Sequence, residues 1–127
     1  MKILVIDDEP LVRRSLARAL RARGHESEEA VDGQEGLKLW NESQPDGVFV
    51  DVLMPGLSGP EVVRIALEQK ISRGHAPVIA LISAFSGEDS EKLAHDSGAD
   101  CFIAKPFEDI FTVVDQLIEM IKSRRLR

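Results

Sequence analysis

Five short runs of apolar residues alternate along the chain with stretches in which apolar residues recur every three or four positions. A short apolar run is typical of a buried strand, and the spacing of three to four is typical of a helix with one buried face. Strands are expected at about residues 2–7, 25–30, 47–51, 77–83 and 101–104. This alternation predicts an α/β fold with a doubly wound, five-stranded parallel sheet, for which we expect the strand order 2-1-3-4-5.

The segments between and after these runs predict helices at about residues 10–23, 34–43, 59–69, 88–97 and 107–121. The last helix has the most regular apolar stripe, and Val113 and Met120 lie off that stripe, where they could meet a partner. The second strand is largely charged, which favours a place at the edge of the sheet. The fourth helix offers little beyond Leu93 and Ala94 for burial, so we expect it to move most readily.

Composition adds limits to this picture. A chain of 127 residues with 43% hydrophobic and 30% charged residues fits one soluble globular domain. We expect that domain at residues 1–121, followed by a basic tail or linker stump at 122–127. The formal charge of −6 argues against nucleic-acid binding, and no apolar stretch has the roughly 20 residues that span a membrane. The single cysteine, Cys101, excludes an internal disulfide, so we expect a cytoplasmic protein.

Chemically active residues gather at one address, the carboxyl ends of the predicted strands. Asp7 and Asp8 follow the first strand, Asp51 ends the third, Ser83 ends the fourth, and Lys105 follows the fifth. If the first and third strands are neighbours, three carboxylates converge where such sheets bind their ligands. Carboxylates that close repel one another and need a cation, and oxygen ligands suit Mg²⁺ or Mn²⁺.

These residue types can carry out phosphoryl transfer. Asp7 and Asp8 would hold the metal, and Asp51 would be a nucleophile that forms an aspartyl-phosphate. Ser83 would donate a hydrogen bond to a phosphoryl oxygen, and Lys105 would supply a mobile positive charge. Each residue alone could equally be a turn, cap or surface residue. Their joint position on successive strand ends favours a common function.

The motifs behind this site resemble those of a known family. They are Val5-Ile6-Asp7-Asp8-Glu9-Pro10, Asp51-Val52-Leu53-Met54-Pro55 with Gly59, Ser83-Ala84, and Gly98-Ala99-Asp100 leading into Lys105-Pro106-Phe107. In this order and spacing, the chain resembles a response-regulator receiver domain of two-component signalling, with the CheY-like fold, over about residues 2–121.

The resemblance implies a phosphoacceptor at Asp51 that takes a phosphoryl group from the phosphohistidine of a sensor histidine kinase or a histidine phosphotransfer protein. It also implies that the backbone carbonyl of Leu53 completes the Mg²⁺ ligands. Phosphorylation would draw Ser83 inward and rotate Phe102, where relatives often carry tyrosine. The face formed by the fourth helix, fifth strand and fifth helix would then bind a downstream protein or output domain. Such a domain is a switch rather than an enzyme that turns over an external substrate.

Two apolar residues suggest slow loss of the phosphoryl group. Leu53 lies two residues after Asp51, and Phe85 lies two after Ser83. Members of the family with fast hydrolysis tend to place polar side chains there, which can orient the attacking water. Apolar side chains should exclude that water instead, so we expect a long-lived phosphorylated state.

Three other interpretations remain open at this point. A haloacid-dehalogenase-like phosphatase also uses an aspartate and Mg²⁺, but it needs two acids separated by one residue, a role that only Asp7 and Glu9 could fill. A flavodoxin-like nucleotide carrier would need a phosphate-binding first loop, which the acids at 7–9 would oppose. A receiver-like interaction domain would never be phosphorylated. Within the receiver interpretation, a free-standing protein, a phosphorelay shuttle and an excised domain are all possible.

Overall fold

The computed structural model describes residues 1–84 and 89–126, and in these residues five strands alternate with five helices. The elements in chain order are β1 (Lys2–Ile6), α1 (Pro10–Ala22), β2 (Glu26–Ala30), α2 (Gly33–Ser43), β3 (Gly47–Asp51), α3 (Gly59–Glu68), β4 (Val78–Ser83), α4 (Ser90–Ser97), β5 (Cys101–Ala104) and α5 (Ile110–Arg125). The predicted alternation of strands and helices is confirmed.

The five strands form one parallel sheet in the order β2-β1-β3-β4-β5, as predicted. The strongly charged β2 lies at an edge, where only one of its sides needs a partner strand. The switch in strand order falls between β1 and β3, so their carboxyl ends are neighbours. This is the place where ligands bind in open α/β sheets.

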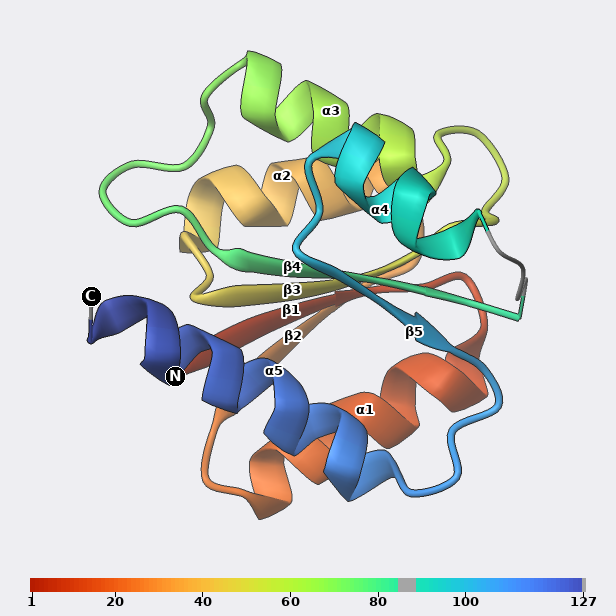
Figure 1. Cartoon of the computed structure of the whole chain (residues 1–127), viewed down its shortest axis with the longest axis vertical. Coiled ribbons are helices and arrows are strands. Elements are labelled where there is room, and N and C mark those ends of the chain that lie inside the picture. Colours follow the sequence, from red (N-terminus) through yellow and green to blue (C-terminus); the bar gives the residue numbers. More distant parts are fainter. Residues whose placement is uncertain (85–88, 127) are drawn as a thin grey trace.

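Helices cover both faces of the sheet (Figure 1), with α1 and α5 on one face and α2, α3 and α4 on the other. Successive strand residues point to opposite faces. In β1, Ile3 and Val5 therefore belong to the core under α1 and α5, whereas Leu4 and Ile6 belong to the core under α2, α3 and α4. Burial on both faces explains why the central strands are continuous apolar runs rather than alternating ones.

Short polar residues set the starts of three helices. Asp32 accepts a hydrogen bond from the Glu35 backbone at the start of α2, and Asp109 accepts one from the Phe111 backbone at the start of α5. Ser58 caps α3, because its Oγ accepts a hydrogen bond from the backbone of Glu61. These bonds satisfy backbone N–H groups that have no partner inside the helix.

The last helix differs from its prediction on two points. Val113 is buried in the core beside α1, so it is not a free contact for a partner, whereas Met120 packs against the same core and is only partly buried. Phe111 follows the spacing of three to four that defines the predicted apolar stripe, but it lies near the surface under the guanidinium of Arg23, which is 4.5 Å from the ring centre. The helix also continues through Lys122–Arg125, past the expected start of a tail. Among the described residues, no helix is long and apolar enough to cross a membrane.

Candidate functional site

Strand register brings the predicted site residues to one edge of the sheet. Ile6 pairs with Val50, so the residues that follow them, Asp7 and Asp51, lie side by side. Ser83, the last residue of β4, pairs with Ala104, and the backbone N–H of Lys105 donates to the Ser83 carbonyl at 2.8 Å. The structure therefore places every strand-end residue named from the sequence around one point.

Three carboxylates form the centre of this site. Asp7, Asp8 and Asp51 each offer an oxygen, and these oxygens all lie within 4.8 Å of one another. Asp7 is fully buried and Asp51 is 3% exposed, whereas Asp8 faces solvent. The cluster is thus buried on the sheet side and open on the solvent side.

Lys105 bridges this cluster. Its Nζ lies 3.0 Å from Asp7 Oδ2, 3.0 Å from Glu9 Oε1 and 3.4 Å from Asp51 Oδ2. Asp7 Oδ1 accepts a hydrogen bond from the Glu9 backbone at 2.9 Å. Asp7 Oδ2 has no aligned hydrogen bond among the described residues, although the ammonium is beside it. The two oxygens of Asp7 therefore differ: one is fixed by the backbone and the other is available to a cation.

A buried arginine, Arg13, binds the backbone of Asp7, and the sequence analysis did not identify it. Arg13 donates from Nη1 to the Asp7 carbonyl at 3.0 Å and from Nε to Glu29 at 3.2 Å. Arg13 lies on the inner face of α1, three and four residues before the buried Leu16 and Ala17. The sequence does contain a signal for this role, because an arginine within the apolar stripe of a helix carries a charge that needs buried partners.

The loop after Asp51 is held close to the strand. The Gly59 backbone N–H donates to the Val52 carbonyl at 3.0 Å. A Cβ atom at Gly59 would lie only 2.3 Å from the Asp51 carbonyl oxygen. Gly59 is therefore needed for close approach of two backbone segments, and this approach fixes the end of β3 that carries the Asp51 side chain.

The charges in the site affect one another. Burial, reinforced by the neighbouring negative charge of Asp7, raises the pKa of Asp51 to about 7, even though Lys105 opposes the shift. Burial alone would lower the pKa of Lys105, but its contacts with Asp7 and Glu9 outweigh burial and raise that pKa. The site thus holds a lysine that stays charged beside an aspartate whose charge is unfavourable until more positive charge arrives.

The site suits a divalent cation. Its donors are carboxylate oxygens, which Mg²⁺ and Mn²⁺ prefer, and no aligned hydrogen bond among the described residues holds the buried Asp7 Oδ2. Asp7, Asp8 and Asp51 are the residues that would hold it. The exposed side of the cluster leaves room for the water molecules that Mg²⁺ usually retains.

The structure describes three of the remaining predicted residues. Leu53 is 67% exposed beside the strand end, and Ser83 is buried at the end of β4. Phe102 is half-buried, packs on the core under α2, α3 and α4, and lines a hollow between α4, β5 and α5. Phe85 lies outside the described residues.

Comparison with known proteins identifies the family. A family model described as the response regulator receiver domain matches residues 3–122. The chain belongs to this family. It is therefore a receiver domain of the kind found in two-component systems, and the match favours this interpretation over a phosphatase or a nucleotide carrier.

Curated relatives of this receiver are bacterial response regulators. It is similar to the response regulator MprA of Mycolicibacterium vanbaalenii, with 40% identity over 107 residues, covering 84% of this chain and 45% of the relative. It is also similar to the transcriptional regulatory protein AfsQ1 of Streptomyces coelicolor, with 33% identity over 122 residues, covering 96% of this chain and 51% of the relative. The chain spans about half the length of the curated relatives it matches.

Solved structures agree on the fold. The receiver domain of a Francisella response regulator superposes with a TM-score of 0.86 at 26% identity, covering 97% of this chain and 98% of that one. The chemotaxis protein CheY4 of Vibrio cholerae superposes with a TM-score of 0.84 at 26% identity, covering 93% and 96%. The predicted CheY-like fold is confirmed.

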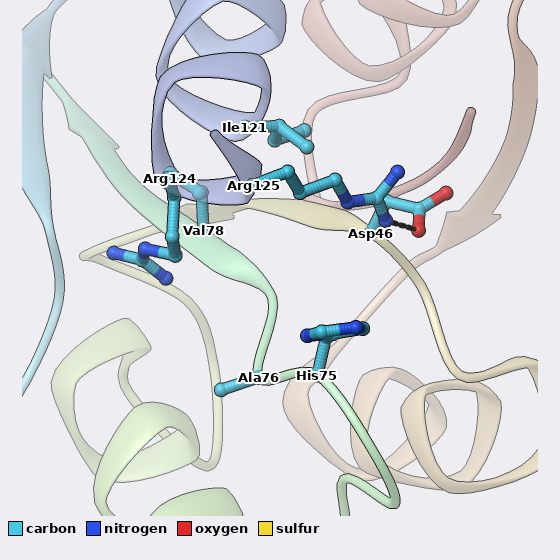
Figure 2. A pocket seen from close by; sticks show the side chains of 7 residues that line it. All are labelled: Asp46, His75, Ala76, Val78, Ile121, Arg124 and Arg125. Atoms are coloured by element: carbon cyan, nitrogen blue, oxygen red, sulfur yellow. Dashed lines mark hydrogen bonds and ion pairs between the residues drawn. The ribbon is translucent and has the colours of Figure 1, made fainter. Parts of the chain in front are cut away.

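A second hollow, of about 220 Å³, lies at the opposite edge of the sheet, where the amino ends of β3 and β4 meet the last turn of α5 (Figure 2). Arg124 and Arg125 from the last turn of α5 border it together with Asp46 and His75. Both arginines are already paired, Arg125 with Asp46 and Arg124 with Asp100. The arginines at this hollow therefore attach α5 to the sheet, and their charges are balanced by the two aspartates.

Proposed function

We propose that this receiver accepts a phosphoryl group on Asp51 from the phosphohistidine of a sensor histidine kinase or a histidine phosphotransfer protein. The observation that carries the proposal is the contact set of Lys105, which joins the strand ends of β1, β3 and β5 at one carboxylate cluster. Family membership supports it, because response regulators are the partners of such kinases.

The transfer would proceed by attack of an Asp51 carboxylate oxygen on phosphorus. The new bond is O–P, the bond that breaks is the P–N bond of the phosphohistidine, and its electron pair returns to the imidazole nitrogen of the donor. Lys105 would stabilise the negative charge of the phosphoryl oxygens, and the Ser83 hydroxyl would donate a hydrogen bond to one of them. A divalent cation bound by Asp7, Asp8 and Asp51, with the Leu53 carbonyl, would supply further neutralisation of those oxygens.

The product is a modified protein, so we propose a switch and not an enzyme that turns over an external substrate. Ser83 and Phe102 would couple the phosphoryl group to the surface made by α4, β5 and α5, where a downstream protein or an output domain would bind. The greater length of the relatives supports an output domain, and the name of AfsQ1 indicates transcriptional regulation for that protein. We place this signalling in the cytoplasm, on the support of the family.

Labelling by a small phosphodonor tests the proposal. Incubation with acetyl phosphate and Mg²⁺ should add one phosphoryl group per chain, detected by intact-protein mass spectrometry. Asp51→Asn should abolish the addition, whereas Asp96→Asn, which removes an exposed aspartate of α4, should retain it. Equal labelling of the Asp51→Asn variant would refute the assignment.

The same experiment measures the lifetime of the phosphorylated state. After removal of the donor, we expect the label to persist for minutes or longer, because Leu53 offers no group to orient a water. Leu53→Asn should shorten the lifetime. Leu11→Asn changes a leucine that is 84% exposed on α1, on a different element near the site, and should leave it unchanged. Decay within seconds in the unmodified protein would contradict the expectation.

A further inference from the structure

Glu9 stands at the start of α1, but its side chain binds Lys105 instead of capping the helix. It occupies the N-cap position of that helix, and its carboxylate makes no capping hydrogen bond. Instead it reaches across the site, where Oε1 accepts a hydrogen bond from Lys105 Nζ at 3.0 Å. The backbone of Glu9 is fixed at the same time by its bond to Asp7 Oδ1. This residue is thus anchored to the cluster by its backbone and to the lysine by its side chain.

The three carboxylates that contact Lys105 are not equivalent. Asp7 and Asp51 belong to the cluster that would hold a divalent cation, whereas Glu9 does not. A cation bound to that cluster and the ammonium of Lys105 would compete for the same two aspartates, and like charges at such short distances repel strongly. Glu9 is the contact of Lys105 that this competition leaves intact.

We propose that Glu9 is a positioning residue that keeps Lys105 at the mouth of the site when a divalent cation occupies Asp7, Asp8 and Asp51. With Glu9 present, the ammonium gives up Asp7 and Asp51 without losing every partner. It then stays at the mouth of the site, bound to Glu9, where it can meet the oxygens of a phosphoryl group on Asp51. The assignment rests on the proposed function only for this last role of Lys105, because the competition itself concerns cation binding.

Two features of the site support this role. The Glu9 side chain is 59% exposed, so its carboxylate can stay hydrated while it holds the ammonium. Glu9 and Lys105 also border a common open hollow of about 440 Å³, together with Ser15, Ala84 and Pro106. The ammonium therefore has space on the Glu9 side of the site, away from the buried Asp7.

Binding of Mn²⁺, followed by the electron paramagnetic resonance signal of the free ion, tests the proposal without any phosphodonor. Glu9→Gln should weaken Mn²⁺ binding about threefold to tenfold, and Lys105→Gln should strengthen it by a similar factor, because the competing charge is gone. In the Lys105→Gln background, Glu9→Gln should have a clearly smaller effect. This non-additivity is the signature of a residue that acts through Lys105.

A second comparison uses variants that retain Lys105, so its result does not depend on whether the Lys105→Gln variant folds. Glu9→Asp preserves the charge but shortens the side chain, so it should lose most of what Glu9→Gln loses. Glu108→Gln removes an exposed charge three residues after Lys105 and should change Mn²⁺ binding little. Equal effects of Glu9→Gln in both backgrounds, or wild-type binding by Glu9→Asp, would show that Glu9 acts only as a nearby charge and would overturn the proposal.

The two proposals fail separately. If Asp51 is labelled by acetyl phosphate and the Mn²⁺ effects are additive, the role of Glu9 is wrong and the phosphoacceptor assignment stands. If the Mn²⁺ effects are coupled and no label appears on Asp51, the positioning role stands and the proposed function fails.

Discussion

At the scale of single residues, Asp51 bears a charge that the surrounding fold disfavours. Burial and the charge of Asp7 together raise its pKa to about 7. In the unfolded chain this carboxyl group is ionised at neutral pH, so folding must either bury that charge or take up a proton. A site of this kind is costly for stability, and it gains from any positive charge that binds to it.

The metal-free protein should consequently become more stable when this carboxyl group is removed. Because the pKa of Asp51 is raised in the folded state, protonation of this carboxyl group stabilises the folded protein. This contribution is complete below the ordinary aspartate pKa of about 3.9 and is lost as pH rises toward 7. Asp51→Asn should match the wild type near pH 4 and exceed it by about 2–4 kcal/mol at pH 8. Urea unfolding in the presence of a chelator measures the difference.

Saturating Mg²⁺ should reverse the order of the two proteins, since a cation stabilises only the folded form that binds it. Asp96→Asn serves as the control, because its carboxylate is exposed on α4 and should show neither effect. A metal-free Asp51→Asn variant that is less stable than wild type at pH 8 would contradict the raised pKa.

The residues of the site differ in how far the sequence predicts them. Asp7, Asp51, Ser83 and Lys105 were predictable because strand ends in a parallel sheet meet at one edge, whatever the side-chain conformations are. The contact of Glu9 with Lys105 was not predictable in this way. It depends on how far two flexible side chains, 96 residues apart in the chain, reach across the site.

At the scale of elements, the β3–α3 loop controls where Asp51 points. The chain leaves β3, turns, and returns so closely that Gly59 packs against the backbone of Asp51 itself. The start of α3 is set by local chemistry, the Ser58 cap and the proline in the first turn, which a sequence can reveal. The sequence could not reveal the close approach, because that depends on the path of the whole loop.

Gly59→Ala should therefore affect both stability and the site. Its Cβ would meet the Asp51 carbonyl oxygen, so the loop must shift, at a cost of about 1–3 kcal/mol in the free energy of unfolding. The shift should also weaken Mg²⁺ binding, measured by the Mg²⁺ dependence of the thermal midpoint.

Gly56→Ala is a matched control in the same loop. Gly56 has φ of +79° and nothing within 4 Å of an added Cβ, so alanine there meets backbone strain of about 1 kcal/mol without a clash. It should leave Mg²⁺ binding unchanged. If both variants lowered Mg²⁺ affinity equally, the close approach at Gly59 would not be the cause.

The element α5 shows where a periodic pattern is insufficient. The stripe of apolar residues predicted the helix and most of its buried face, yet Val113 is inside and Phe111 is at the surface. A helix in a groove between a sheet and α1 is buried over a wider arc than one stripe, which includes Val113. Phe111 lies at the border of that arc, where Arg23 supplies a cation over its ring.

At the scale of the whole molecule, the two edges of the sheet carry opposite kinds of electrostatics. The carboxyl edge, where the strands end, gathers acids around one lysine. At the opposite edge, where the strands begin, two aspartates each have an arginine and a backbone N–H as partners. Asp46 accepts from the Lys2 backbone at 2.7 Å and pairs with Arg125, and Asp100 accepts from the Ile79 backbone at 2.7 Å and pairs with Arg124. The ion pair of Arg125 with Asp46 at the opposite edge is drawn in Figure 2.

The two edges should therefore respond oppositely to pH. Burial tends to raise the pKa of Asp46, but the Lys2 backbone N–H and Arg125 lower it overall. A lowered pKa stabilises above the ordinary value of about 3.9 and is lost as pH falls through the folded-state pKa.

Arg125→Gln should thus cost about 0.5–1 kcal/mol between pH 5 and 8, because the pair is partly exposed, and less below pH 4. Urea unfolding across this range measures the cost, Lys122→Gln at the loose pair with Glu119 should show none, and Mg²⁺ binding should be unchanged. A cost that stayed constant down to pH 3 would mean that Arg125 contributes by packing instead of charge. In that case, of the two edges, the carboxyl edge alone would link stability to the charge of an aspartate, because removal of the Asp51 charge stabilises there.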